Sequence, residues 1–178
     1  MPKSSQSQII ADEKKIIIEL QKNSKASIDN IAKNCGCSRQ KVWRIIKRLE
    51  ENKTIWGYHA IVDNEKIGEK IYQILIKKTP TPISEKMMNA LLEKGTTEKL
   101  AKFDVKFDCS FYTQGYFDWS LYITAPNIMM VKKFLEILNS NFSEYISEIQ
   151  VLEVVFPLLK SGFENPNTSE IKEFFLTQ

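Results

Sequence analysis

Apolar side chains in the first third of the chain recur three or four residues apart, which is the spacing of one face of a helix. They predict a first helix over residues 11–23, a short second helix capped by Ser27, and a third helix that begins after Ser38. Gly36 lies between the second and third helices, where a tight turn requires a left-handed residue. Two helices joined by a short glycine-containing turn predict a helix-turn-helix.

The pattern changes after the third helix. Apolar and polar residues alternate from Thr54 to Val62 and strand formers are frequent, which predicts a wing or hinge strand. Further on, the spacing predicts strands over 71–78, 105–113, 116–124 and 146–157 and helices over 84–94 and 127–139. This β-α-β-β-α-β order is that of a ferredoxin-like domain. The predicted class is therefore α+β: an N-terminal winged helix-turn-helix followed by a C-terminal ferredoxin-like βαββαβ regulatory domain.

These elements divide the chain into five parts. They are a disordered tail over 1–10, a winged helix-turn-helix DNA-binding domain over 11–63, a linker over 64–70, a ferredoxin-like dimerisation and effector domain over 71–158, and a C-terminal extension over 159–178. Two interpretations of the extension stay open. It forms a tail helix packed at a subunit interface, or it is disordered.

A ferredoxin-like sheet carries its helices on one face only. We assign Tyr72, Ile74, Phe111, Tyr122 and Val154 to the other face, which then exposes apolar area that needs a cover. A second copy of the chain is the simplest cover, so we expect a homodimer.

Charge gives the first indication of function. The only three arginines of the chain, Arg39, Arg44 and Arg48, fall in the third predicted helix, and no acidic residue occurs between Ser38 and Leu49. Residues 1–60 hold twelve basic and six acidic side chains, net +6, whereas residues 61–178 hold thirteen and sixteen, net −3. A helix with an apolar back and a cationic front favours a polyphosphate partner, because guanidinium binds phosphates and guanine edges in a bidentate way.

Composition excludes several other classes. No apolar run approaches the roughly 18–20 residues that span a bilayer, and the polar start lacks the apolar core of a signal peptide. The odd number of cysteines, Cys35, Cys37 and Cys109, gives no disulfide framework. We interpret the cysteines as packing residues, since structural zinc usually needs four ligands. A cytoplasmic protein without metal or cofactor is expected.

Several segments resemble the Lrp/AsnC (feast/famine) family of transcription regulators. The segments that carry the resemblance are Ile31-Ala32, Cys37-Ser38, Val42, residues 44–50, Ile55, Gly57-Tyr58, Ala60, Val62-Asp63 and Ile67-Gly68. In the second half, the βαββαβ order and Gly115-Tyr116-Phe117-Asp118 resemble the family's regulatory domain and its Gly-x-aromatic-Asp hairpin. The sequence departs from the family at Thr54, where a glycine is expected, at the large Trp43, and in the segment after Pro157.

The resemblance implies a DNA-binding repressor or activator that dimerises, often to octamers, through its C-terminal domain. It also implies a small effector, commonly an amino acid, bound between subunits near the hairpin. The positions that match the family's recognition helix are Ser38, Gln40, Trp43, Arg44 and Lys47. The positions that match its effector loop are Gly115, Phe117 and Asp118.

The residue types suggest separate roles along the third helix. We expect Lys41, Lys47, Arg48 and Arg39 to contact phosphates, and Gln40 and Arg44 to reach base edges. Trp43 either touches a thymine methyl or the sugar backbone, or packs under the wing, which we favour. The complete set of expected DNA-binding residues is Ser38, Arg39, Gln40, Lys41, Trp43, Arg44, Lys47 and Arg48.

Two interpretations of Asp118 stay open. Its carboxylate takes the amino group of an effector, or it caps the hairpin. Because the chain has no arginine outside the third helix, an effector carboxylate must use lysine or backbone donors.

Two other functions are weighed against the regulator. Siroheme decarboxylases resemble these regulators in architecture, but residues 61–178 lack the arginine and histidine that a tetrapyrrole with many carboxylates requires. No catalytic constellation appears either, so we expect no enzyme. A winged-helix protein-interaction module is the other alternative, and salt-insensitive partner binding would favour it.

Overall fold

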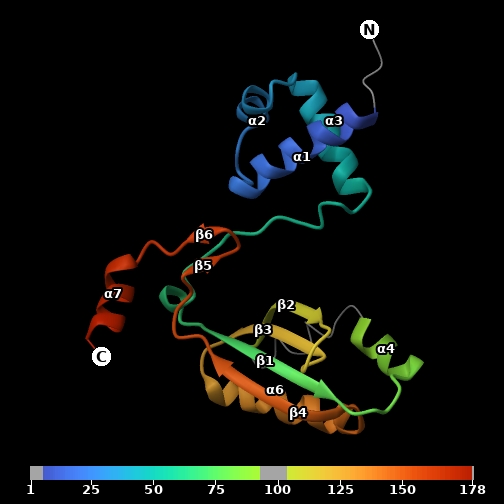
Figure 1. Cartoon of the computed structure of the whole chain (residues 1–178), viewed down its shortest axis with the longest axis vertical. Helices are drawn as coiled ribbons and strands as arrows, with labels where there is room; N and C mark the ends of the chain where they lie inside the picture. Colours follow the sequence, from blue (N-terminus) through green and yellow to red (C-terminus); the bar gives the residue numbers. More distant parts are fainter. Residues whose placement is uncertain (1–5, 93–103, 178) are drawn as a thin grey trace. The chain divides into compact units, whose positions relative to one another are not determined.

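The computed structural model describes residues 6–92 and 104–177, which fall into two compact units (Figure 1). The first unit extends to Ile61 and includes Ser161–Phe163, and the second comprises Val62–Lys160 and the residues from Glu164 onward.

The first unit is a bundle of three helices, α1 (Gln6–Lys22), α2 (Ile28–Cys35) and α3 (Arg39–Glu51). Side-chain hydroxyls cap two of them: Ser27 Oγ accepts the N–H of Asn30, and Ser38 Oγ accepts the N–H of Lys41. Gly36 adopts the left-handed conformation at φ 63° and turns the chain from α2 into α3. The predicted helix-turn-helix and its capping residues are confirmed.

The core of this unit takes apolar side chains from all three helices. They are Ile16 of α1, Ile31, Ala32 and Cys35 of α2, and Val42, Ile45 and Leu49 of α3. Burial of the last three fixes which side of α3 faces inward. The opposite side of α3 is therefore free to point away from the bundle.

Two predictions for the N-terminal part are wrong. Residues 6–10 belong to α1 and not to a disordered tail, because Gln8 Nε2 donates to Asp12 Oδ1 one turn later and Ile9 is half-buried. Residues 1–5 of the predicted tail lie outside the described residues. The predicted wing strand over 54–62 does not form either. Only Ile55 packs on the core there, whereas Trp56 is 94% exposed and the segment pairs with no strand among the described residues.

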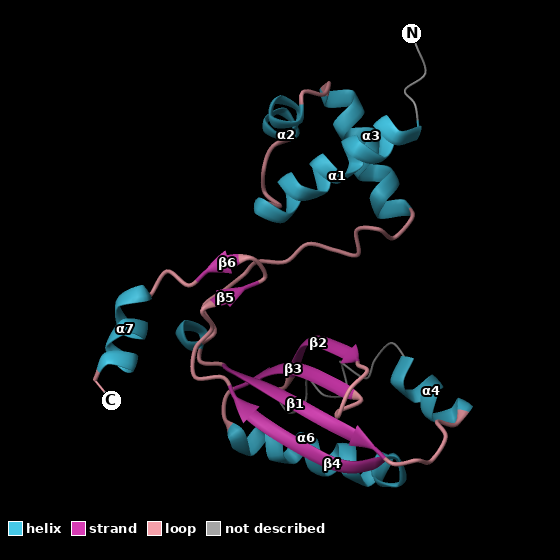
Figure 2. Cartoon of the chain, viewed as in Figure 1, coloured by secondary structure: helices cyan, strands magenta, loops and turns pink. Residues whose placement is uncertain are grey.

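The second unit is built on a four-stranded antiparallel sheet (Figure 2). Its strands are β1 (Lys70–Lys78), β2 (Lys106–Tyr112), β3 (Trp119–Ala125) and β4 (Ile146–Glu153), in the order β2-β3-β1-β4. Helix α4 (Glu85–Leu92) follows β1, and α6 (Ile128–Phe142) follows β3, with Asn127 as its N-cap. This order confirms the ferredoxin-like prediction. Residues 93–94 of the predicted second-unit helix lie outside the described residues.

Helix α6 covers one face of the sheet (Figure 2). Tyr72, Ile74 and Ile76 of β1 are buried in the same core as Val131 and Phe134 of α6. Assigning Tyr72 and Ile74 to the uncovered face was therefore wrong. The segment Ile71–Ile76 is apolar at every position except Gln73, so its pattern does not show which alternate residues face the core. A shift of one residue exchanges the two faces of the strand.

The face opposite α6, on which no helix packs among the described residues, is named the open face, and its residues follow from the strand register. Leu75 lies opposite Ser120, Gln73 opposite Tyr122, and Phe111 opposite Ser120. The apolar residues of the open face are Ile71, Leu75, Phe111, Tyr122, Leu152 and Val154. The assignments of Phe111, Tyr122 and Val154 are thus confirmed.

The C-terminal extension is folded. Strand β4 ends at Glu153, short of the predicted Pro157, and a small hairpin of β5 (Leu159–Lys160) and β6 (Phe163–Glu164) leads to α7 (Thr168–Leu176). Lys160 Nζ donates to Asn64 Oδ1 at 2.6 Å, and Asn167 Nδ2 donates to Asp63 Oδ2 at 3.1 Å. The extension forms a helix, as one of the two interpretations held, and polar contacts fasten it to the segment that leads into β1. Its packing at a subunit interface stays a prediction.

Two 3₁₀ turns, η1 (Glu65–Ile67) and η2 (Ser143–Tyr145), complete the second unit. Across residues 6–92 and 104–177, no helix has both the length and the apolar character required to cross a membrane.

Candidate nucleic-acid interface

Four of the expected DNA-binding residues form one exposed row on α3. Gln40, Trp43, Arg44 and Lys47 are spaced three or four residues apart and are all exposed. The buried Val42, Ile45 and Leu49 hold the other side of the helix against α1 and α2. The structure therefore brings together the residues to which base reading was assigned.

Arg44 is the least constrained cation of this row. Its Nε donates to the backbone carbonyl of Gln40 at 3.4 Å, and no ion pair joins it to an acidic residue among the described parts of the chain. Lys47 is weakly held, since its Nζ lies 3.8 Å from Glu51 and 5.3 Å from the centre of the Trp43 ring. Both side chains are thus available to a ligand.

Trp43 does not pack under a wing. Its side chain is 52% exposed, and the strand that was expected to cover it is not formed. The favoured packing interpretation is therefore wrong. The other interpretation, a contact with a thymine methyl or the sugar backbone, remains a prediction.

The outer cations of α3 each meet an acid from another helix. Arg39 Nε lies 2.7 Å from Asp29 Oδ1 of α2, and Arg48 Nη2 lies 2.5 Å from Glu13 Oε1 of α1. Lys41 Nζ pairs with Asp12 of α1, whose side chain is buried. Lys41 is therefore directed into the bundle, which sets it apart from the other residues expected to contact phosphate.

The sequence interpretation missed these acids. Asp12 and Glu13 suggested the first turn of a helix that starts at Ala11, where acids suit the helix dipole. Because α1 starts at Gln6, both lie in its second turn and face α3 instead. Two adjacent acids on α1, two helices before a stretch of α3 that carries five cations and no acid up to Leu49, are the signal that would have indicated them.

The pair of Asp12 and Lys41 links stability to pH. The hydrogen bond from Lys41 holds the pKa of the Asp12 carboxyl below its ordinary value of 3.8, against the opposing effect of burial. A carboxyl whose pKa is depressed by folding stabilises the fold above that ordinary value, and the contribution is lost as pH falls through the folded pKa.

We expect Asp12→Asn to lower the free energy of unfolding of the first unit by about 1–2 kcal/mol at neutral pH, because Lys41 loses its charged partner. Wild type should lose this advantage as pH falls from about 3.8 through the lowered pKa of its folded carboxyl. Urea unfolding followed by circular dichroism between pH 2.5 and 7 measures both effects. Glu51→Gln, which removes an exposed carboxylate of the same unit, serves as control. A gap between Asp12→Asn and wild type that is constant across this range would contradict the assignment.

The expected effector loop sits at the turn between β2 and β3. The N–H of Asp118 donates to the carbonyl of Ile76 at 2.9 Å, and its Oδ2 accepts the N–H of Lys78 at 2.8 Å. Thr113 Oγ1 donates to the carbonyl of Phe117 at 2.7 Å and closes the hairpin, at whose tip Gly115 is exposed. The Asp118 carboxylate therefore ties this end of the hairpin to β1, and whether it also takes an effector stays a prediction. That role leaves its second carboxylate oxygen to be tested for ligand binding.

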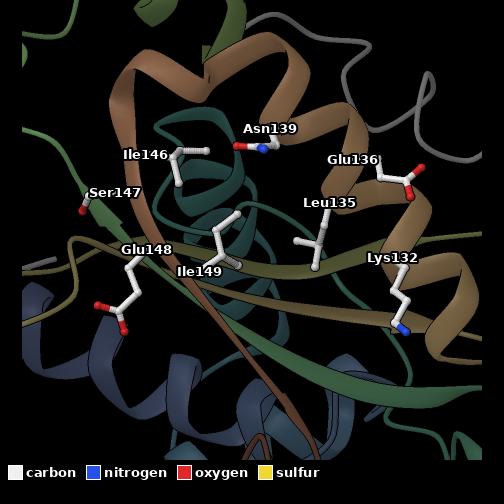
Figure 3. A pocket seen from close by; sticks show the side chains of 8 residues that line it. All are labelled: Lys132, Leu135, Glu136, Asn139, Ile146, Ser147, Glu148 and Ile149. Carbon is white, nitrogen blue, oxygen red and sulfur yellow. The ribbon is translucent and has the colours of Figure 1, made fainter.

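Tyr116 of the same turn joins the hairpin to β4. Lys77 Nζ lies 3.8 Å from the centre of the Tyr116 ring, and the hydroxyl of Tyr116 donates to Glu148 Oε2 at 3.0 Å. Glu148 also borders a shallow groove of about 450 Å³ between α6 and β4 (Figure 3). The groove is lined by Lys132, Leu135, Glu136, Asn139, Ile146, Ser147, Glu148 and Ile149. Nothing in residues 6–92 and 104–177 groups three or more histidine, cysteine or acidic side chains for a metal ion.

Comparisons with known proteins agree with this arrangement. A family model described as winged helix-turn-helix DNA-binding matches residues 13–55. The HTH-type transcriptional regulator FL11 of Pyrococcus furiosus is 30% identical over 129 residues, which are 72% of this chain and 78% of that protein.

Solved structures share the fold over most of this chain. The AsnC family transcriptional regulator from Agrobacterium tumefaciens matches with a TM-score of 0.62 at 21% identity, over 89% of this chain and 97% of that one. The transcriptional regulator NMB0573 from Neisseria meningitidis, solved as an L-Met complex, matches with a TM-score of 0.62 at 16% identity, over 89% and 97%. The helix-turn-helix, the ferredoxin-like sheet and the extended similarity to FL11 together place this chain in the Lrp/AsnC family, as a DNA-binding transcription regulator.

Proposed function

We propose that the protein binds double-stranded DNA sequence-specifically through the exposed row of α3. The observation that carries this proposal is Arg44, a guanidinium in the centre of the row with no acidic partner among the described residues. Arg44 and Gln40 read base edges, and Lys47, Arg39 and Arg48 contact phosphates. Ser38 helps by fixing the start of the helix, and Trp43 packs on the sugar or a thymine methyl. Lys41 contributes indirectly, by holding α3 on Asp12.

Selection of bound duplexes from a random pool tests this proposal. Because a dimer presents two recognition helices, the selected site should be an imperfect palindrome with half-sites about one helical turn apart, or a multiple of that. Binding should weaken steeply with salt, since phosphate contacts release counterions. Enrichment of no sequence, or partner binding that does not respond to salt, would contradict the proposal.

The dimer forms, in this proposal, through the open face of the second unit. Its apolar residues come from all four strands of the sheet, with Val154 directly after β4. Phe111 and Leu152 among them are 51% and 41% exposed. Exposed apolar area of this kind marks an interaction surface, and an isologous pair of such faces covers both copies at once. Assembly beyond the dimer, up to an octamer, is part of the family's range.

Phe111→Glu is expected to raise the dissociation constant of the dimer roughly ten-fold or more, because it places a charge without a partner in the apolar interface. Analytical ultracentrifugation over a concentration series measures this change. Met129→Glu is the matched control, since Met129 is 55% exposed on α6, which covers the other face. Equal effects of the two substitutions would contradict an interface on the open face.

A small effector, in this proposal an amino acid, binds near the hairpin of Gly115, Phe117 and Asp118. The support is the family membership and the L-Met found with the Neisseria relative. An amino group would be taken by the Asp118 carboxylate, and a ligand carboxylate by lysine or by backbone N–H groups, because all three arginines lie in α3.

Asp118→Ala is expected to abolish the rise in melting temperature that the effector causes in wild type. Thermal shift assays with the twenty amino acids measure this response. Asp118→Ala also removes the cap on the Lys78 N–H and should lower the unliganded melting temperature by a few degrees. Thr113→Val is the control for that loss, because it breaks a hairpin hydrogen bond without removing a charge. An unchanged effector response in Asp118→Ala would remove the residue from the site.

A further inference from the structure

The two ends of α3 differ from its centre in one respect. Arg39 at the start of the helix and Arg48 near its end are each paired with an acid from another helix, whereas Arg44 between them is not. The pairs reach across the bundle to Asp29 on α2 and Glu13 on α1. The local sequence of α3, which is free of acids up to Leu49, hides this arrangement.

We propose that Asp29 and Glu13 compete with DNA phosphates for Arg39 and Arg48, and thereby lower the sequence-independent affinity of the protein for DNA. The inference rests on the proposed function, because it requires that the exposed row of α3 faces the duplex. In this proposal, two acidic residues lower the affinity for DNA although neither contacts a base.

The competition follows from the chemistry of guanidinium. Carboxylate and phosphate both bind the same planar fork of N–H donors, so an arginine that turns to a phosphate must give up hydrogen bonds to its acid. If the acid stays close, it also repels the approaching phosphate. Either way, a phosphate contact by Arg39 or Arg48 is less favourable than one by an arginine without an acidic partner.

The pairs are weak enough to open. The side chains of Arg39 and Asp29 are 72% and 56% exposed, and those of Arg48 and Glu13 are 47% and 22% exposed. Exposed ion pairs change an equilibrium constant by roughly two- to five-fold. The acids therefore attenuate the phosphate contacts and do not abolish them.

The distribution of the acids favours discrimination. Sequence-independent binding comes almost entirely from phosphates, whereas base contacts supply the preference for one site. Because random sites vastly outnumber specific ones, a lower phosphate affinity reduces the fraction of protein held elsewhere on the DNA. The contacts of Arg44 keep their full value, since no acid opposes them.

Glu13→Gln tests the proposal on the intact protein. Fluorescence anisotropy with a labelled random-sequence duplex at low salt should show a dissociation constant roughly two- to five-fold lower than that of wild type. Glu19→Gln is the matched control: it removes the same charge from the same helix, but Glu19 pairs with Lys22 and Asn34 and not with α3. The control should change the dissociation constant much less.

A double-mutant cycle identifies the arginine as the group that is released. In an Arg48→Gln background, Glu13→Gln should tighten binding no more than Glu19→Gln does. Asp29→Asn, measured with and without Arg39→Gln, repeats the test at the other end of the helix and guards against a folding defect in one variant. Thermal unfolding of each variant monitors folding.

Equal effects of Glu13→Gln and Glu19→Gln, or tightening that persists in full without Arg48, would overturn this inference and leave the proposed function standing. Wild-type protein that binds no duplex at all would overturn both.

Discussion

Arg44→Ala is expected to weaken binding to the selected DNA site by about 1–3 kcal/mol, roughly 5- to 150-fold, while affinity for random DNA changes far less. The reason is that Arg44 lies in the centre of the exposed row and makes only a hydrogen bond to its own helix, so its donors are available for a base edge. Competition binding with the selected duplex and a scrambled duplex of equal composition measures both affinities.

Arg44→Lys separates charge from shape. It keeps the positive charge and should retain the affinity of wild type for random DNA, but it loses the bidentate fork and therefore most of the preference for the selected site. Equal losses of affinity for both duplexes in Arg44→Ala would show that Arg44 contacts only phosphates. Gln40 or Lys47 would then be the residues that contact base edges.

Phe134→Ala is expected to lower the free energy of unfolding of the second unit by about 3–5 kcal/mol. Phe134 is 2% exposed in the core under the sheet, and its ring packs edge-on against Phe107 at 5.6 Å. Since whole domains are stable by only about 5–15 kcal/mol, this loss is a large fraction of the total. Urea unfolding followed by the fluorescence of Trp119 measures it in a variant that lacks the other two tryptophans.

Met129→Ala is the control on the same helix. Its side chain is 55% exposed, and substitution of such a surface position should change the free energy of unfolding by less than about 0.5 kcal/mol. A similar, small effect of both substitutions would show that α6 is not held to the sheet by its apolar side.

The elements that the sequence predicted best carry local signals. Ser27, Gly36 and Ser38 each have one structural role, as a cap or a left-handed turn, and the structure confirms all three. The apolar spacing of α3 likewise fixed its buried side, and the resemblance to the Lrp/AsnC family is confirmed by the similarity to FL11. Local chemistry of this kind does not depend on what the rest of the chain does.

The predictions that failed depend on contacts distant in the sequence. The alternation over 54–62 suits a strand, but no partner strand lies beside it among the described residues, and a strand without a partner gains no ladder of hydrogen bonds. The sequence does not show which face of β1 is buried, because apolar residues occupy both faces of the strand. Only packing against α6 determines the buried face.

The pairing of the α3 cations was hidden for the same reason. Asp12 and Glu13 lie about thirty residues before their partners, at separations of 29 and 35. Between Ser38 and Leu49, five cations without an acid indicated a uniformly basic surface. The fold divides that surface into a central row and two attenuated ends.

The central claim is that the exposed row of α3 is the surface that meets the duplex, and Trp43 reports on it directly. In a Trp56→Phe, Trp119→Phe variant, Trp43 is the only one of the three tryptophans that remains. Acrylamide quenching of its fluorescence should fall when the selected duplex is added, because the half-exposed ring becomes covered. Binding of the duplex, shown by anisotropy in the same sample, without any change in this quenching would contradict the account.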